Sequence, residues 1–466
     1  MKIVSSYAIR IKNADKIFSQ TIRIYRSAVK FCINVFELEW DFLKDIDNSK
    51  YQAAAARSLI HSTKSNQAKY PEFDILFYKY PCYLLTATIN EAIGILNSYH
   101  SNLENYENSD KEGNPPRLQA NHLIFPVFYR NNMSLYSDGS DTIQLKLFID
   151  NDWKYMTFHL NCNDAVNIVK RAGGHRLSAP ALEKKHKTWR LRFSFEDNQK
   201  LNNTPLKNRT ILAVDLGINT CATCSVMKYD GTITARKFID FPVEKDQLNH
   251  ALNKIKKLQR RFGSHNVKKL WRIAKDKNDE IARKTVGELI RLAADMGADV
   301  IVFEHLDTKH KKSGTRKQRL QMWNHQYVQN LVTHKAHLLG IRISRICAKN
   351  TSRLAFDGSG LVLRGKNAGF NTYELCKFQS GKIYNCDLSA SYNIGARYFI
   401  REIEKLYINE SKLNSEIVKI TNNSKPADEK ISLLSEMRAE VPGFQKRTQN
   451  TLKTLTAIHE YLAACA

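Results

Sequence analysis

"ILAVDLGINTCATC", residues 211–224, has a single carboxylate, Asp215, at the end of an apolar run. An uninterrupted apolar run of this kind is typical of a buried strand. Gly217 permits a tight turn after the run, so a second strand is expected over Thr220 to Tyr229 and a third over Thr232 to Phe238. Because Asp-x-Gly follows strands in many unrelated sheets, this stretch alone leaves open whether Asp215 is a turn residue or a metal ligand.

Two further acids follow apolar segments downstream. "GADVIVFEHL", 297–306, is another apolar strand that ends in Glu304, and "IYNCDLSASYNIGARYF", 383–399, has Asp387 at the start of a predicted helix. The apolar stripe of that helix runs through Ala390, Ile394, Ala396 and Phe399. Carboxylates at two strand ends and one helix start can converge on a pair of divalent cations, which hard oxygen ligands hold. Each acid alone is more simply a cap or a solvated residue, but together they predict catalytic, metal-binding residues Asp215, Glu304 and Asp387.

In the first half of the chain, the spacing of apolar residues changes from the period of a helix to the period of a strand. Apolar residues recur every three or four positions over residues 14–44, which predicts a long amphipathic helix. In "TWRLRFSFE", 188–196, apolar and polar residues alternate, which is typical of a strand. We expect an antiparallel sheet or small barrel over 118–196, with Arg190 and Arg192 on its polar face. Those arginines fit phosphate contacts and a solvated sheet surface about equally well.

Positive charge indicates a polyanionic partner. The 466 residues contain 72 Lys and Arg against 46 Asp and Glu, a formal net charge of +26, which nucleic acid would neutralise. "NKIKKLQRRFGSHNVKKLWRIAKDK", 253–277, is a basic helical stretch, and "KHKKSGTRKQR", 309–319, is a basic loop just past Glu304 that could guide a strand. The predicted nucleic-acid contacts are Arg190, Arg192, Lys254, Lys257, Arg260, Arg261, Lys268, Lys269, Arg272, Lys311, Lys312, Arg316, Lys317 and Arg319.

The motifs around the three acids follow a recognisable order. After the Asp-x-Gly strand come "FEHLD", Trp323, "THKAHLLGI", "KNTS" at 349–352, and a closing Asp387 with "YNIGAR". This order resembles the RuvC nuclease of the TnpB proteins and miniature type V CRISPR effectors. The resemblance is specific over about 209–400 and is architectural only, helices followed by strands, over 1–208.

The resemblance implies a multidomain α+β fold. A ribonuclease H-like (RuvC) α/β nuclease domain would be preceded by a helical recognition lobe inserted in an antiparallel β-barrel wedge domain. The expected bounds are 1–12 and 117–200 for the wedge-like β domain, 13–116 for the helical lobe, 201–208 for a linker, 209–350 and 383–424 for the RuvC-like nuclease, 351–382 for a target-strand insert, and 425–466 for a C-terminal helical extension.

The insert departs from the family pattern. Relatives carry a zinc ribbon with two cysteine pairs there, whereas "TSRLAFDGSG" and "LCKFQSG" offer Ala355, Ser359, Cys376 and Ser380 near the expected ligand positions. Structural zinc takes four N or S ligands, so we expect a degenerate zinc-ribbon-like segment without zinc. The apolar residues expected to hold a metal-free hairpin are Leu361, Leu363, Phe370 and Tyr373.

The resemblance implies an RNA-guided DNA endonuclease. Asp215 would bridge two Mg²⁺ ions, for which Mn²⁺ could substitute, while Glu304 and Asp387 would each hold one ion. The implied partners are a guide RNA and target double-stranded DNA with a short flanking motif, and the sequence does not distinguish a monomer from a homodimer on each guide. It also does not distinguish a transposon from a CRISPR locus.

Two alternatives remain at the level of sequence. A non-cleaving RNA-guided DNA-binding repressor or targeting protein is the first, although all three acids are present. A guide-free resolvase explains the large front half less well. No apolar run approaches the roughly 20 residues of a bilayer span, so we expect no membrane partner and a cytoplasmic, nucleoid-associated protein of a prokaryote.

Overall fold

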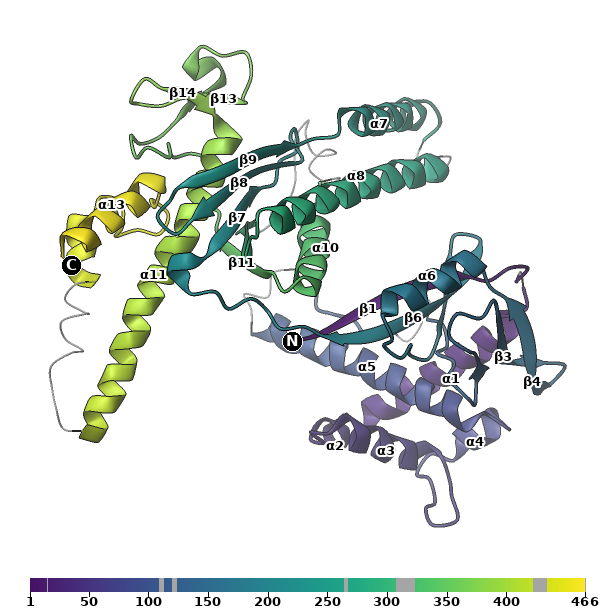
Figure 1. Ribbon diagram of the computed structural model, residues 1–466. Helices are drawn as coiled ribbons and strands as arrows, with labels where there is room; N and C mark the ends of the chain where they lie inside the picture. Colours follow the sequence, from purple (N-terminus) through teal and green to yellow (C-terminus); the bar gives the residue numbers. More distant parts are fainter. Residues whose placement is uncertain are drawn as a thin grey trace. The chain divides into compact units, whose positions relative to one another are not determined.

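The computed structural model describes residues 1–14, 16–108, 113–119, 124–263, 267–306, 323–421 and 434–465, with the side chains of 409–421 left out. The chain forms two compact units (Figure 1). The N-terminal unit is Lys2–Asn198, and the C-terminal unit is Gln199–Ala466 together with Met1. Among the described residues, no helix has both the length and the apolar character needed to cross a membrane.

The N-terminal unit contains two small antiparallel sheets and six helices among its described residues. One sheet has the order β1-β6-β5 and the other β2-β3-β4. The strands are β1 (Lys2–Arg10), β2 (Ser134–Leu135), β3 (Thr142–Ile149), β4 (Asp152–His159), β5 (Ala181–Lys185) and β6 (Thr188–Asn198). The helices are α1 (Ser19–Leu38), α2 (Trp40–Lys44), α3 (Ser49–Ile60), α4 (Glu72–Leu76), α5 (Cys82–Glu107) and α6 (Cys162–Ala172). Since β1 pairs with β6, helices α1 to α5 are inserted between a strand and its sheet.

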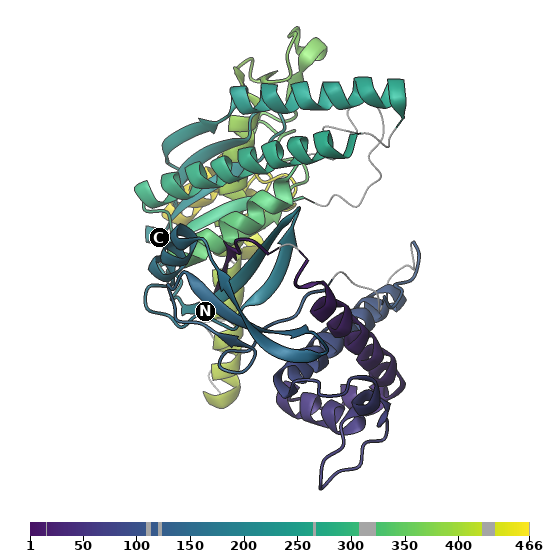
Figure 2. The same ribbon diagram turned by 90° about the vertical axis from the view of Figure 1, so that its right-hand side faces the viewer.

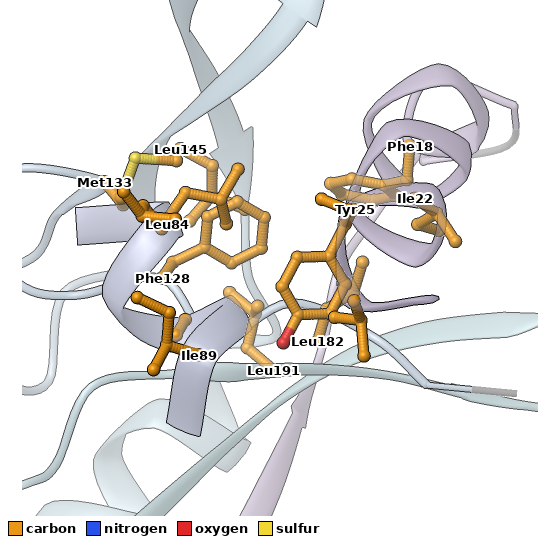
Figure 3. Close-up of a cluster of buried hydrophobic side chains, with 14 of the residues drawn as sticks. Phe18, Ile22, Tyr25, Leu84, Ile89, Phe128, Met133, Leu145, Leu182 and Leu191 are labelled. Carbon is orange, nitrogen blue, oxygen red and sulfur yellow. The ribbon is translucent and has the colours of Figure 1, made fainter. Parts of the chain in front are cut away.

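One apolar core joins the helices and both sheets of this unit. Figure 3 shows Tyr25 of α1 directed into this cluster, beside Leu182 of β5 and Leu191 of β6. The alternation predicted for β6 is confirmed, because Trp189, Leu191, Phe193 and Phe195 are buried. The long amphipathic helix expected over 14–44 is confirmed as α1, but the helical run starts at Ser19 rather than at Ala14 and is divided at Glu39 into α1 and α2.

The C-terminal unit is built on a five-stranded sheet with the order β11-β10-β7-β8-β9. Its strands are β7 (Thr210–Asp215), β8 (Ala222–Lys228), β9 (Ile233–Ile239), β10 (Val300–His305) and β11 (Arg342–Cys347). Strands β7, β8 and β9 are antiparallel, as the opening stretch of sequence predicts. Strand β10 returns parallel to β7 and pairs with β11 on its other edge.

Helices cover both faces of this sheet. Helix α11 (Cys386–Thr421) packs on one face, and α8 (Lys268–Asp295) and α10 (His325–Leu338) pack on the other. Figure 2 shows α7 (Pro242–Phe262) lying beside α8, and α13 (Leu452–Ala464) packs against α11. The predicted apolar stripe of α11 is confirmed, since Ala390, Ile394, Ala396 and Phe399 are fully buried.

The basic stretch 253–277 is helical as predicted, in two helices: α7 ends at Phe262, where Gly263 takes a φ of +72° that favours glycine, and α8 begins at Lys268. One local expectation in this unit is wrong. The insert forms a small sheet of β12 (Leu363–Arg364), β13 (Leu375–Lys377) and β14 (Ile383–Asn385). Its core is not the expected one, because Leu361, Leu363 and Tyr373 are exposed while Ala355, Cys376, Phe378 and Cys386 are buried.

Candidate active site

Parallel pairing of β7 and β10 brings the first two predicted acids to the same edge of the sheet. The last paired residues are Phe303 and Val214, so Glu304 and Asp215 follow at the same level. Successive side chains on a strand alternate between faces. Ala213 of β7 and Val302 of β10 both belong to the core under α11, and therefore Asp215 and Glu304 also face the α11 side.

The third acid, Asp387, lies more than 80 residues after Glu304 in the sequence, and helix α11 brings it to the same face of the sheet. Asp387 lies in its first turn, where the Asn385 side chain accepts a 2.9 Å hydrogen bond from the backbone N–H of Leu388. The helix approaches the sheet closely at Gly395, where an added Cβ would lie 2.8 Å from Met227 Sδ and 3.4 Å from Ala213 Cβ. The small residue thus lets the start of α11 lie over the strand ends.

The three carboxylates influence one another electrostatically. Burial raises the pKa of Asp215 well above its usual range, and the negative charges of Glu304 and Asp387 raise it further. Burial also raises the pKa of Glu304 and the pKa of Asp387. All three side chains keep partial access to solvent, so a cation can reach them. In the described part of the chain, no three His, Cys, Asp or Glu side chains lie close enough to hold one metal ion in this conformation.

Arg364 of β12 is a cation beside the acids that sequence reasoning missed. Its positive charge opposes the raised pKa of Asp215 and that of Asp387. Its guanidinium is held by donation from Nη2 to the backbone carbonyl of Ser352. The residue lies in a two-residue strand with no periodic pattern, so its position depended on how the insert folds rather than on any local signal.

A loop from the "KNTS" motif supports Glu304. Thr351 Oγ1 donates a hydrogen bond to Glu304 Oε1, and this bond opposes the raised pKa of the carboxyl group. Asn393 of α11 fixes the loop by donating to the carbonyls of Thr351 (3.0 Å) and Leu354 (2.9 Å). The helix that carries Asp387 therefore also positions the partner of Glu304.

Arg397, one turn beyond Asn393, ties the same loop to a distant segment. The buried guanidinium donates to the carbonyls of Cys347 (2.9 Å) and Lys349 (2.7 Å) before the motif. It also donates to the carbonyls of Thr448 and Asn450, each at 3.0 Å. Residues 448–450 precede α13, so part of the C-terminal extension, to which sequence reasoning gave no role, braces the site.

A solved structure of another protein shares the fold of this chain. The solved structure of Cas12f1 with single-guide RNA and target DNA is 14% identical, with 81% of each chain covered and a TM-score of 0.52. The chain shares the fold of Cas12f1. The mini RNA-guided endonuclease Cas_phi3 is 12% identical over 84% of this chain and 92% of that one, with a TM-score of 0.45. Residues 5–149 match the Aq_aa04 family profile, and no curated protein matches the chain by sequence. The structural neighbours are type V CRISPR effectors, in agreement with the predicted resemblance.

Within this Cas12f1-like fold, the insert replaces the expected zinc ligands by other contacts. Asp357 accepts hydrogen bonds from the backbone N–H of Ser359 (3.0 Å) and from Ser380 Oγ (2.8 Å). Ala355 and Cys376 are fully buried in the small core of the insert. Of the four positions near the expected zinc ligands, Ser359 and Ser380 therefore form hydrogen bonds to Asp357, and Ala355 and Cys376 form part of an apolar core. The absence of zinc stays a prediction.

The predicted basic residues fall into three groups. Lys254, Lys257, Arg260 and Arg261 are exposed on α7, and Lys268, Lys269 and Arg272 are exposed on α8. Lys311, Lys312, Arg316, Lys317 and Arg319 lie outside the described residues. In the N-terminal unit Arg190 is half-buried, and Arg192 is exposed but donates to Glu183, so a phosphate would have to compete with that carboxylate.

Proposed function

We propose that this protein is an RNA-guided DNA endonuclease with a RuvC-type active site formed by Asp215, Glu304 and Asp387. The observation that carries the proposal is that two strand ends and one helix start bring three acids to one face, where the charges of Glu304 and Asp387 raise the pKa of Asp215. The strand order β11-β10-β7-β8-β9, with the first acid on the central strand, supports the ribonuclease H-like assignment.

Two observations support a guide RNA and a target DNA as the partners of this protein. The fold is that of Cas12f1, whose structure was solved with single-guide RNA and target DNA. The net charge of +26 fits a protein that neutralises many phosphates. The insertion of α1 to α5 between β1 and β6 supports a recognition lobe within a wedge domain, near the bounds expected from the sequence. The guide would then supply sequence specificity by base pairing, while the protein reads a short flanking motif.

The donor set fits divalent metal ions. Carboxylate oxygens are hard ligands that suit Mg²⁺ and Mn²⁺, and three partly buried acids that raise one another's pKa are unfavourable without a compensating cation. Two ions, when bound, supply activation of a water and stabilisation of the leaving oxygen.

The residues of the chain have separate tasks in this proposal. Asp215, on the central strand, would contact both ions, while Glu304 and Asp387 would each contact one. Thr351 orients the Glu304 carboxylate, and its hydrogen bond favours the charged form that binds metal. The Arg364 guanidinium, next to the acids, would neutralise charge on the scissile phosphate as the new P–O bond forms and the old one breaks.

Substitution of Asp215 tests the proposal. Asp215→Asn should abolish metal-dependent cleavage of a guide-matched target while leaving guide-dependent DNA binding intact. Asp230→Asn is the matched control, because Asp230 lies in the turn between β8 and β9, where it accepts hydrogen bonds from Thr232, and should cleave normally. A variant Asp215→Asn that still cuts with Mg²⁺ present would refute the assignment.

A non-cleaving RNA-guided DNA-binding protein is the second candidate. The observation that favours it is the departure of the insert from the nuclease pattern, with Ala355, Ser359 and Ser380 near the positions where cysteine ligands are expected. Guide-dependent retention of target DNA without nicking in either Mg²⁺ or Mn²⁺ would establish this function. Nicking that requires metal and a matching guide would exclude it.

A further inference from the structure

A cavity of about 110 Å³ opens directly after the first acid of the site. Leu216 and Gly217, which follow Asp215, form part of its wall. Leu216 packs with the core under α8 and α10, so the cavity lies on the face of the sheet opposite to that of the acids. Its remaining walls come from Ile218 and Cys221 in the loop between β7 and β8, from α7 and α8, and from residues 323–328 at the start of α10. It is therefore a separate site that shares one strand end with the candidate active site.

The lining combines apolar walls, one large aromatic ring and neutral amides. Leu248, Leu252 and Ile281 are apolar and buried, and Trp323 is partly exposed beside them, with its ring 4.5 Å from that of His325. Asn249 brings an exposed side-chain amide to the cavity.

The charged groups at this cavity are already neutralised. Lys245, which lines it, donates to the carboxylate of Asp240 and to the carbonyl of Asn219. Asn324 donates to Asp279 Oδ1 at 3.1 Å, and no residue of the described part of the chain donates to its side-chain oxygen, which can therefore accept a hydrogen bond from a ligand. The chemistry therefore suits an uncharged, flat ligand with hydrogen-bonding groups at its edge.

The volume restricts that ligand to a single ring. An engineered, enclosed protein cavity of about 150 Å³ binds benzene, so this half-open cavity of about 110 Å³ holds one six-membered ring with the polar groups of the ring edge at its opening, and has no room for a two-ring purine. Aromatic side chains bind nucleobases by stacking, and amides bind their edges. Among the common bases, the pyrimidines match both the size and the edge chemistry.

One exposed cation of α7 lies beyond the cavity. Lys245, Asn249 and Leu252 line the cavity from one face of this helix, and Lys256 is the next residue on that face and is exposed. A strand whose base occupies the cavity would have its phosphates beside this cation. Charge complementarity thus favours a polynucleotide over a free aromatic metabolite.

We propose that this cavity binds one unpaired pyrimidine base of a single-stranded nucleic acid. The proposal rests on the proposed function only for the role of that strand, which would be held by its base next to the strand end that carries Asp215. Base binding itself needs neither metal nor cleavage. The cavity would act as an anchor that fixes the register of a displaced or cut strand.

Photocrosslinking tests the cavity directly. The full-length protein in EDTA is mixed with a single-stranded oligonucleotide that carries one 5-iodo-2′-deoxyuridine, irradiated and analysed by peptide mass spectrometry. We expect a crosslink at Trp323, competed by oligo(dT) at least about fivefold better than by oligo(dA), as loss of one stacked base implies. Crosslinks only at other residues, or equal competition by both oligonucleotides, would overturn the proposal.

Two variants and one control separate base binding from a folding defect. Trp323→Leu removes the ring, and Cys221→Met fills the cavity from another wall; both should abolish the preference for oligo(dT) while the thermal unfolding curve stays cooperative. Trp271→Leu is the control, since Trp271 packs in the α7–α8 core outside the cavity lining and should keep the preference. Equal effects of Trp323→Leu and Trp271→Leu would overturn the proposal.

The outcome is independent of the nuclease assignment. If the crosslink at Trp323 forms but guided cleavage is absent with every metal, base binding in the cavity is supported and the nuclease proposal is refuted. If cleavage depends on Asp215 but the protein does not prefer oligo(dT) over oligo(dA), the nuclease proposal is supported and base binding in the cavity is refuted.

Discussion

Thr351 donates a hydrogen bond to the carboxylate of Glu304 across 47 residues of sequence. The loop that carries Thr351 is held by Asn393 of α11, the same helix whose first turn carries Asp387. The second and third acids are thus positioned by one helix. This arrangement makes the geometry of Glu304 dependent on the packing of α11 against the sheet.

Thr351→Val should lower cleavage without lowering guide-dependent DNA binding. The valine keeps the shape of threonine but cannot orient the carboxylate, and hydrogen bonds to charged groups contribute about 1.5–3 kcal/mol. We expect a decrease in the single-turnover cleavage rate of about tenfold or more. Thr351→Ser, which keeps the hydroxyl, should cleave at close to the wild-type rate. Equal activity of the valine and serine variants would show that the hydroxyl has no positioning role.

Asp215→Asn should stabilise the metal-free protein. Burial and two neighbouring acids raise the pKa of Asp215 above that of an unfolded chain. A raised pKa contributes stability that is fully present below the unfolded pKa and is lost as pH rises through the folded pKa. At pH 8 in EDTA the variant should therefore unfold about 2 °C or more above the wild type. The difference should shrink as the pH falls toward 4. Asp230→Asn should not be stabilising, because hydrogen bonds from Thr232 lower the pKa of Asp230.

Metal binding should release protons. The raised pKa values of Asp215 and Glu304 mean that these groups hold protons at higher pH than ordinary carboxyls, and a metal must displace them. The apparent affinity for Mg²⁺ or Mn²⁺ should weaken as pH is lowered through the raised pKa values. Titration calorimetry in buffers of different ionisation enthalpy measures the released protons. A metal affinity that does not change with pH would contradict the raised pKa values.

The strand ends of the candidate site could be predicted because local patterns define them. Apolar runs that end in Asp215 and Glu304 predict buried strands, and the stripe of α11 predicts which face of the helix meets the sheet. The order of strands in a sheet depends on contacts between distant segments and not on local patterns. The position of β10 between β7 and β11, parallel to both, could therefore be learned only from the structure or from a resemblance.

The insert and the C-terminal segment show where sequence patterns fail. Strands of two or three residues are too short for alternation to define a buried face, and this is why Leu361 and Leu363 were wrongly expected in the core. Arg364 donates to a backbone carbonyl, which carries no residue-type signal, so its position near the acids could not be predicted. Arg397 belongs to the quoted motif "YNIGAR", but its carbonyl partners, and therefore its role, could not be predicted for the same reason. Helix α6 was not predicted, although Asn161 caps it by accepting from Asp164 N–H at 3.2 Å.

Exposed cations on α7 should contribute to the salt dependence of nucleic-acid binding. Lys254, Lys257 and Arg261 are exposed and lie on one face of the helix. Replacing all three by alanine should reduce the slope of log K against log salt by about 0.7 for each lost single-strand phosphate contact. The matched control replaces three exposed lysines that already form ion pairs, Lys2, Lys44 and Lys154, and should change the slope less. An equal change in both triple variants would mean that α7 has no specific contact.

Arg397 should matter for both stability and catalysis, because it joins two backbone segments from within the core. Its guanidinium donates to four carbonyls, two before the Thr351 loop and two in residues 448–450. Lysine cannot reproduce this fork, so Arg397→Lys leaves buried carbonyls without donors and should cost about 3 kcal/mol in the free energy of unfolding. The released loop would also loosen Thr351, so cleavage should fall at temperatures where the variant is still folded. Arg438→Lys is the matched control, since Arg438 contacts α11 through an ion pair with Glu404 and is partly exposed. If Arg397→Lys unfolds like the wild type and cleaves at the wild-type rate, the segment 448–450 does not brace the site.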